Sequence, residues 1–129
     1  MKSRTLTVSI SRPPAEVYHF ASNPENFPDW AQSFCESIDR QEGDWILATR
    51  DGQMKIRFIE ENPYGLLDHY VTVAPGREIH VPMRVVPNGA GAEVIFTLYQ
   101  MPGMSDAKFD EDAGMVERDL QSLKRVLEG

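Results

Sequence analysis

The chain has 129 residues, 41% of them hydrophobic, and a formal net charge of −7. This length and composition suit one globular domain spanning residues 1–129, and the acidic charge disfavours nucleic acids and anionic membranes as partners. The single cysteine excludes an intrachain disulfide, and we find neither a signal peptide nor a membrane span, so we expect a cytoplasmic protein.

The N-terminal part predicts one strand and two short helices. Apolar residues alternate with Thr and Ser over residues 5–11, which is the period of a strand with one buried face. Pro13 and Pro14 end this strand and suit the first turn of a helix over residues 15–21. A second short helix is expected at residues 25–30, after the interruption at Asn23 and Pro24.

The central part predicts about six antiparallel strands separated by tight turns. The first four strands are expected at residues 34–40, 45–50, 54–58 and 66–73, with a hairpin turn at Asp51 and Gly52 between the second and third. The last two, over residues 79–85 and 94–98, flank a turn centred on residues 88–91. Pairing across that centre places Val85 opposite Val94, Met83 opposite Phe96 and Val81 opposite Leu98 on one apolar face.

The C-terminal part predicts one long amphipathic helix. Ser105 is a suitable N-cap, acidic residues follow it, and basic residues occupy the last turns. An apolar stripe with 4-3-4-3-4 spacing runs over about six turns. The stripe consists of Phe109, Ala113, Val116, Leu120, Leu123 and Leu127.

This order of elements predicts an α+β fold of the helix-grip type. About seven antiparallel strands form a curved sheet around the terminal helix, with the two short helices after the first strand. A single helix covers only part of a concave face of that width, so we expect a pocket between the sheet and the helix. We predict that Met54, Phe58, Met83, Phe96 and Val116 line it.

Two segments also resemble a known family. They are VSISRPPAEVYHF at residues 8–20 and NPENFPDW at residues 23–30, and the end of the chain agrees through VPMRVVPNG at residues 81–89, FTL at residues 96–98 and the terminal helix. The sequence resembles the polyketide cyclase/dehydratase-like branch of the START-like (SRPBCC) superfamily. The resemblance implies the same helix-grip fold, but it does not imply one function, because this superfamily includes lipid carriers, hormone receptors, cyclases and a co-chaperone.

His69 is the residue most suited to chemistry. It alternates with Leu67 and Val71 on the more apolar side of its predicted strand, where it would be the one titratable group. It could contact a ligand carbonyl or hydroxyl, transfer a proton as a catalytic residue, or be a core histidine satisfied by the backbone. A slip of one residue would instead turn Asp68 inward.

The predicted ligand contacts combine this histidine with large apolar side chains. They are Trp30, Phe34, Met54, Phe58, His69, Val81, Met83, Phe96, Leu98 and Val116. Cys35 has no local base and is expected in the core, and the histidines and the cysteine lack metal-ligand spacing. We therefore predict no metal and no cofactor.

Three classes of function fit these features. The first is a monomeric or homodimeric binding protein for a small hydrophobic or aromatic molecule. The second is a cyclase or dehydratase acting on an aromatic or polyketide-like substrate, with His69 or a tyrosine transferring a proton. The third is a protein-interaction module of the co-chaperone kind, which a wide exposed apolar patch would favour.

Overall fold

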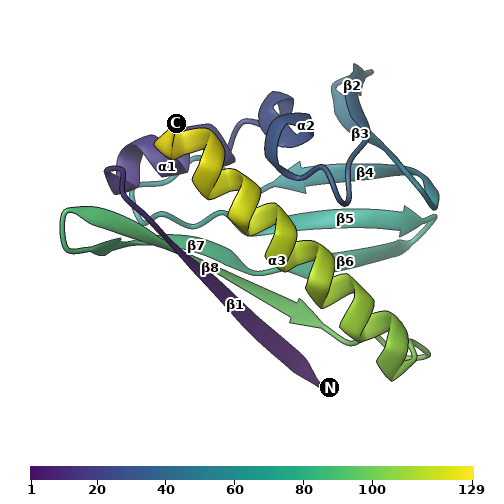
Figure 1. Ribbon diagram of the computed structural model, residues 1–129. Coiled ribbons are helices and arrows are strands. Elements are labelled where there is room, and N and C mark those ends of the chain that lie inside the picture. Colours follow the sequence, from purple (N-terminus) through teal and green to yellow (C-terminus); the bar gives the residue numbers. More distant parts are fainter.

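A computed structural model describes residues 1–129 as eight antiparallel strands, three α-helices and one short 3-10 helix (Figure 1). The elements are, in chain order, β1 (Ser3–Ile10), α1 (Pro14–Ala21), η1 (Pro24–Asn26), α2 (Phe27–Trp30), β2 (Ser37–Gln41), β3 (Asp44–Thr49), β4 (Gly52–Phe58), β5 (His69–Ala74), β6 (Arg77–Val81), β7 (Met83–Asn88), β8 (Gly91–Tyr99) and α3 (Asp106–Glu128). This arrangement confirms the predicted α+β helix-grip class. None of the helices has both the length and the apolar character that crossing a membrane requires.

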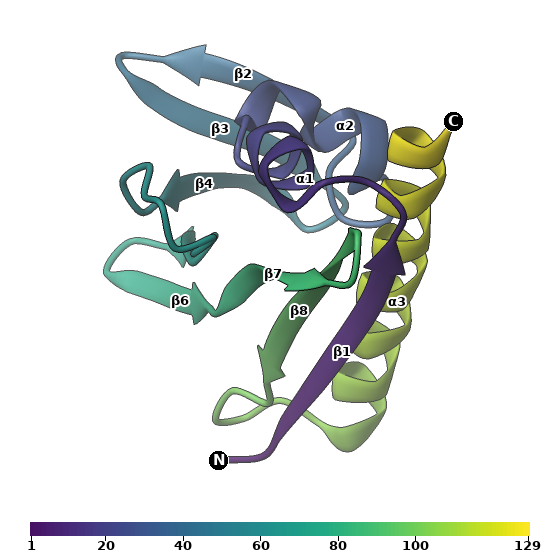
Figure 2. The same cartoon turned by 90° about the vertical axis from the view of Figure 1, so that its left-hand side faces the viewer.

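The strands form two sheets rather than the single sheet of about seven strands that we predicted. One sheet has the order β1-β8-β7 and the other the order β2-β3-β4-β5-β6. Residues 65–67 join them, because the Leu67 N–H donates to the Met83 carbonyl (2.8 Å) and the Val85 N–H donates to the Gly65 carbonyl (2.9 Å). Figure 2 shows the five-stranded sheet on one side and the three-stranded sheet with α3 on the other.

Pro82 explains the eighth strand. It interrupts the predicted strand over residues 79–85, because proline has no N–H to donate to a ladder, and it separates β6 from β7. The pairs Val85–Val94 and Met83–Phe96 are confirmed. The pair Val81–Leu98 is wrong, since Val81 pairs with His69 in β5 and Leu98 pairs with Arg4 in β1.

Two predicted strands begin later than expected. The strand predicted from Phe34 begins at Ser37, because the Phe34 and Cys35 N–H groups donate to the Ala31 carbonyl in a turn that follows α2. The strand predicted from Leu66 begins at His69, because Leu66 forms an isolated bridge with Arg84 instead. In both places, the residues before the strand form backbone hydrogen bonds outside the five-stranded sheet, and this delays the start of the strand.

The terminal helix α3 crosses the strands diagonally and packs chiefly on β1, β8 and α2 (Figures 1 and 2). Ser105 caps it by accepting a hydrogen bond from the Lys108 N–H (3.1 Å), as predicted. Within the predicted stripe, Val116 and Leu127 are half-buried. The fully buried members are Phe109, Ala113, Leu120 and Leu123.

Candidate functional site

A cross-strand row of three side chains forms the centre of the candidate site. Phe58 of β4 pairs with His69 of β5, which in turn pairs with Val81 of β6. Ile56 and its partner Val71 lie on the same face and are buried, whereas Lys55 and Arg57, on either side of Ile56 in β4, are exposed. The row therefore lies on the inner face of the five-stranded sheet.

His69 is buried with only 5% of its surface exposed. Its Nδ1 bonds to the carbonyl of Leu67 at 3.0 Å, and aromatic rings surround it, with Phe58 at 4.9 Å and Phe27 and Phe96 each at 6.2 Å between ring centroids. Burial away from water disfavours the charged imidazolium and lowers the pKa of His69 to about 4. At neutral pH the ring is therefore uncharged.

Asp68, the residue before β5, points to the opposite, outer face of the sheet. Its carboxylate accepts hydrogen bonds from His80 Nε2 (2.9 Å) and from the Met83 N–H (3.2 Å). The register that the sequence left open is therefore the one with His69 inward. Because Asp68 points away from it, the two residues do not form a catalytic dyad.

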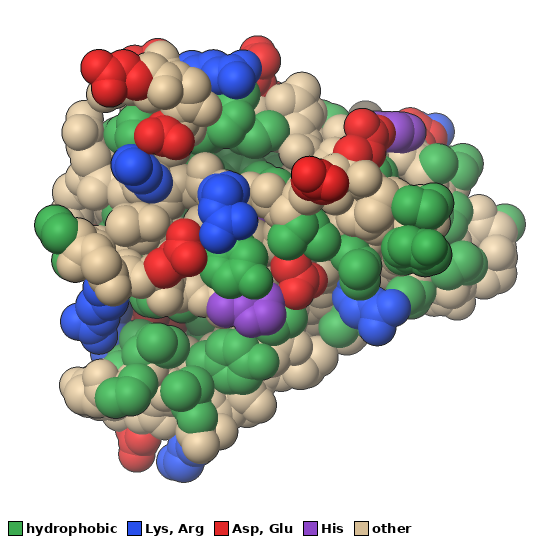
Figure 3. All heavy atoms as spheres, turned by 180° about the vertical axis from the view of Figure 1, so that it is seen from behind, with side chains coloured by type: hydrophobic (Ala, Val, Ile, Leu, Met, Phe, Trp, Pro, Cys, Tyr) green, Lys and Arg blue, Asp and Glu red, His purple; other side chains and the backbone are tan.

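The outer face carries its own cross-strand row. Arg57, Tyr70 and His80 pair in register, with the guanidinium 4.5 Å from the Tyr70 ring centroid and the two rings stacked at 4.9 Å. Charged and apolar side chains are mixed over this face, which Figure 3 shows from behind. These three side chains stack on one another, and we infer that the row stabilises the sheet.

The other predicted contacts divide into two groups. Trp30, Val81 and Met83 are buried, and Trp30 Nε1 has no hydrogen-bond partner. Phe34 lies in the turn after α2 rather than in a strand, and Leu98 lies outside the main core cluster. The half-buried group comprises Phe34, Met54, Phe58, Phe96, Leu98 and Val116.

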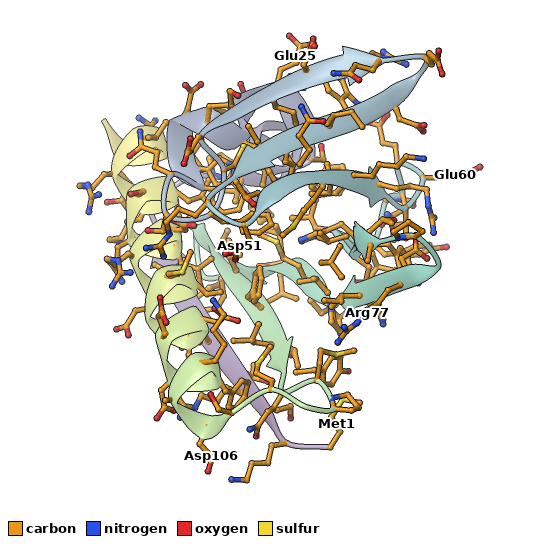
Figure 4. The ribbon with its side chains drawn as sticks, turned by 90° about the vertical axis from the view of Figure 1, so that its right-hand side faces the viewer. Met1, Glu25, Asp51, Glu60, Arg77 and Asp106 are labelled. Atoms are coloured by element: carbon orange, nitrogen blue, oxygen red, sulfur yellow. The ribbon has the colours of Figure 1, made fainter.

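Three inward-facing apolar residues are partly exposed at one end of the five-stranded sheet. Met54, Val73 and Ile79 lie on the face of the buried Ile56 and Val71, yet they keep contact with solvent near the β3–β4 and β5–β6 turns. Figure 4 views this end, with Asp51 labelled in the first turn and Arg77 at the start of β6. The apolar interior therefore reaches solvent on this side.

Two clefts on the surface lie elsewhere. One, of about 720 Å³, separates α1 from the loop at residues 61–65, with Ala15 and Tyr64 among its lining residues. The other, of about 590 Å³, has a polar lining between α3 and the turn at residues 32–33. Neither includes a residue of the predicted pocket, which stays a prediction.

Two buried residues were missed at the sequence level. Phe27 packs its ring against Trp30 (5.2 Å) and Phe58 (5.6 Å), and its spacing of three residues from Trp30 on one helix was the available signal. Asp119 is only 6% exposed and accepts a hydrogen bond from the Ser33 N–H (2.9 Å). Its position between Val116 and Leu123 in the apolar stripe indicated burial.

Cys35 is buried, as expected, and burial raises the pKa of its thiol to about 11, with the nearby Asp119 carboxylate adding to the effect. A thiol with this pKa is a poor nucleophile at neutral pH. The structure contains no cluster of three or more His, Cys, Asp or Glu side chains suited to hold a metal ion.

Comparison with known proteins identifies the family. The family model described as "Polyketide cyclase / dehydrase and lipid transport" matches residues 1–128. The chain belongs to this family. No curated protein matches the sequence. Membership agrees with the resemblance seen in residues 8–30 and 81–98.

Solved structures of distant relatives share the fold. XoxI from Bacillus cereus is 18% identical, with a TM-score of 0.78 over 100% of this chain and 99% of XoxI. DynU16, a protein of the dynemicin biosynthetic locus, is 17% identical, with a TM-score of 0.75 over 99% of this chain and 48% of DynU16. The Aha1 dimer from Colwellia psychrerythraea is 14% identical, with a TM-score of 0.74 over 99% of this chain and 97% of that chain. At these identities the likeness shows the fold alone.

Proposed function

We propose that residues 1–129 form one domain that binds a small hydrophobic or aromatic molecule between the inner face of the five-stranded sheet and α3. The observation that carries this proposal is the partial exposure of Met54, Val73, Ile79 and Val116, which are apolar and face inward. Leaving such side chains in contact with water is costly, at about 25 cal/mol per Å² of apolar surface. An apolar ligand that covers them recovers that free energy.

The chemistry of His69 favours binding over catalysis. A general base works best when its pKa is near the operating pH, whereas the pKa of His69 is lowered to about 4. The row around it offers no second acid or base, since its pairing partners are Phe58 and Val81 and Asp68 faces outward. The family description makes a cyclase or dehydratase activity the alternative, and we rank it second for these reasons.

The surface gives little support for a protein-interaction module. The strongly exposed large hydrophobic residues are far apart in the sequence. They are Met1 before β1, Tyr64 in a loop and Val126 in α3. Single exposed residues of this kind are ordinary on a monomer, whereas a docking face needs a contiguous apolar patch.

The test uses naphthalene as an apolar aromatic probe and two variants that fill different spaces. Val116→Trp adds bulk on the half-buried side of α3 and should weaken binding at least tenfold. Ala15→Trp adds the same side chain to the outer cleft beside α1 and should leave the affinity unchanged. Isothermal titration calorimetry measures both, with circular dichroism as the control for folding.

The opposite pattern would contradict the proposal. Loss of naphthalene binding in Ala15→Trp, with normal binding in Val116→Trp, would place the ligand in the outer cleft. A wild-type protein that binds no apolar probe would remove the proposed function altogether.

A further inference from the structure

We propose that the interior site selects ligands that present a hydroxyl hydrogen, such as phenols and enols, over those that offer only carbonyl or ether oxygens. His69 is the residue that makes this selection. The inference rests on the proposed function and adds the chemical class of the ligand.

The backbone fixes the tautomer of His69. Its Nδ1 lies 3.0 Å from the carbonyl oxygen of Leu67, which can only accept a hydrogen bond. Nδ1 must therefore carry the proton, and in the neutral ring Nε2 is left with a bare lone pair. The side chain is thus a hydrogen-bond acceptor toward anything placed against Nε2.

The protein supplies no hydrogen-bond donor to that lone pair. Its aromatic neighbours are Phe27, Phe58 and Phe96, and its other strand partner is Val81; none of these side chains can donate a hydrogen bond. Asp68 and His80, the titratable groups that act on His69, bond to each other on the outer face of the sheet. Nε2 therefore has no hydrogen-bond partner within the protein, in a residue that exposes only 5% of its surface.

A hydrogen-bond acceptor in apolar surroundings discriminates against ligands that lack a hydrogen-bond donor. A ligand hydroxyl can donate to Nε2, whereas a methyl ether or a carbonyl brings a second lone pair and leaves both atoms unpaired. Sites built around one buried polar group discriminate strongly for this reason, and we expect a preference of about 10- to 100-fold. Because the ring is neutral at pH 7, it acts as an acceptor there, and the preference holds for a ligand hydroxyl that keeps its proton.

The experiment compares 1-naphthol with 1-methoxynaphthalene, which differ only in the hydroxyl hydrogen and its methyl replacement, and includes naphthalene. For the wild-type protein at pH 7, 1-naphthol should bind at least about tenfold more tightly than the ether. In His69→Phe, which keeps the bulk, this preference should vanish while naphthalene binding persists. Equal affinities for the two probes in the wild type, or a preference that survives in His69→Phe, would overturn the inference.

A measurement on the wild type keeps the inference testable if His69→Phe does not fold. Nitrogen-15 NMR of the imidazole distinguishes the two neutral tautomers. A proton on Nδ1, with Nε2 shifting on addition of 1-naphthol, is the expected result, and a proton on Nε2 would overturn the inference. Naphthalene binding that responds to Val116→Trp without any hydroxyl preference would remove this inference alone, whereas failure of every probe would remove the proposed function as well.

Discussion

Acidification should destabilise the protein through His69, and the size of the effect follows from its burial. The folded state lowers the pKa of this imidazole to about 4, against about 6.5 in an unfolded chain. Between these values the unfolded state binds more protons, so this contribution to stability is complete above about pH 6.5 and is lost as the pH falls toward 4. Linkage gives a loss of about 3 kcal/mol between pH 7.5 and pH 4.

The assay is urea denaturation of the wild type and of His69→Phe at intervals between pH 4 and pH 7.5. The difference between the two proteins isolates the histidine, because other titrating groups are common to both. We expect the wild type to lose about 3 kcal/mol more than the variant over this range, with most of the loss between pH 6 and pH 4.5. His19→Gln, which removes an exposed imidazole in place of the buried one, is the matched control.

Parallel curves for the wild type and His69→Phe would refute the reasoning. That result would mean that His69 accepts a proton equally well in the folded and unfolded states, and hence that it is hydrated rather than enclosed by Phe27, Phe58 and Phe96. A difference of the opposite sign would mean that a carboxylate pairs with the ring.

Three further predictions concern the scaffold, and each is checked by urea denaturation. Leu120 is only 2% exposed, so Leu120→Asp buries a carboxylate and should lower the free energy of unfolding by at least about 3 kcal/mol at pH 7. An unchanged urea midpoint would instead place the apolar stripe of α3 in solvent. Gly65→Ala should cost at least about 2 kcal/mol more than Gly76→Ala, because both glycines have φ near +72° but a Cβ at Gly65 would lie 2.2 Å from a carbonyl oxygen of β7; equal losses would show that the chain can move apart there. Burial raises the pKa of Asp119, so Asp119→Asn should be at least as stable as the wild type at pH 7. Asp119→Ala should lose about 1–3 kcal/mol of stability, because it leaves the Ser33 N–H unpaired. A less stable Asp119→Asn would show that the charge itself stabilises the fold.

The inner face of the site was predictable because alternation along a strand is a local property. Leu67, His69 and Val71 share one face in the sequence pattern, and all three are buried in the structure. The same alternation hid the break at Pro82, because residues on both sides of the proline keep the period of two while pairing with different strands. Pattern alone does not say which strand is the partner.

Contacts between distant segments were beyond the sequence. Asp119 meets the Ser33 N–H only because the turn after α2 brings residue 33 beside α3. Phe27 reaches His69 because the fold places α2 beside the start of β5. The volume between the sheet and α3 could not be predicted from the sequence either. It depends on the distance between the sheet and the helix rather than on which residues line them.

The division of the strands at Pro82 has a mechanical consequence. The helix α3 packs on β1 and β8 of one sheet and on α2, while the inner row of His69 belongs to the other sheet. The seam between the two blocks consists of the backbone bonds from residues 65–67 to β7 and the bond from the Thr97 N–H to the Pro82 carbonyl (2.9 Å). Rotation about this seam would change the separation of α3 from the inner row while both ladders stay intact. The width of the space between α3 and the inner row therefore depends on the angle between the two sheets as well as on the side chains that line it.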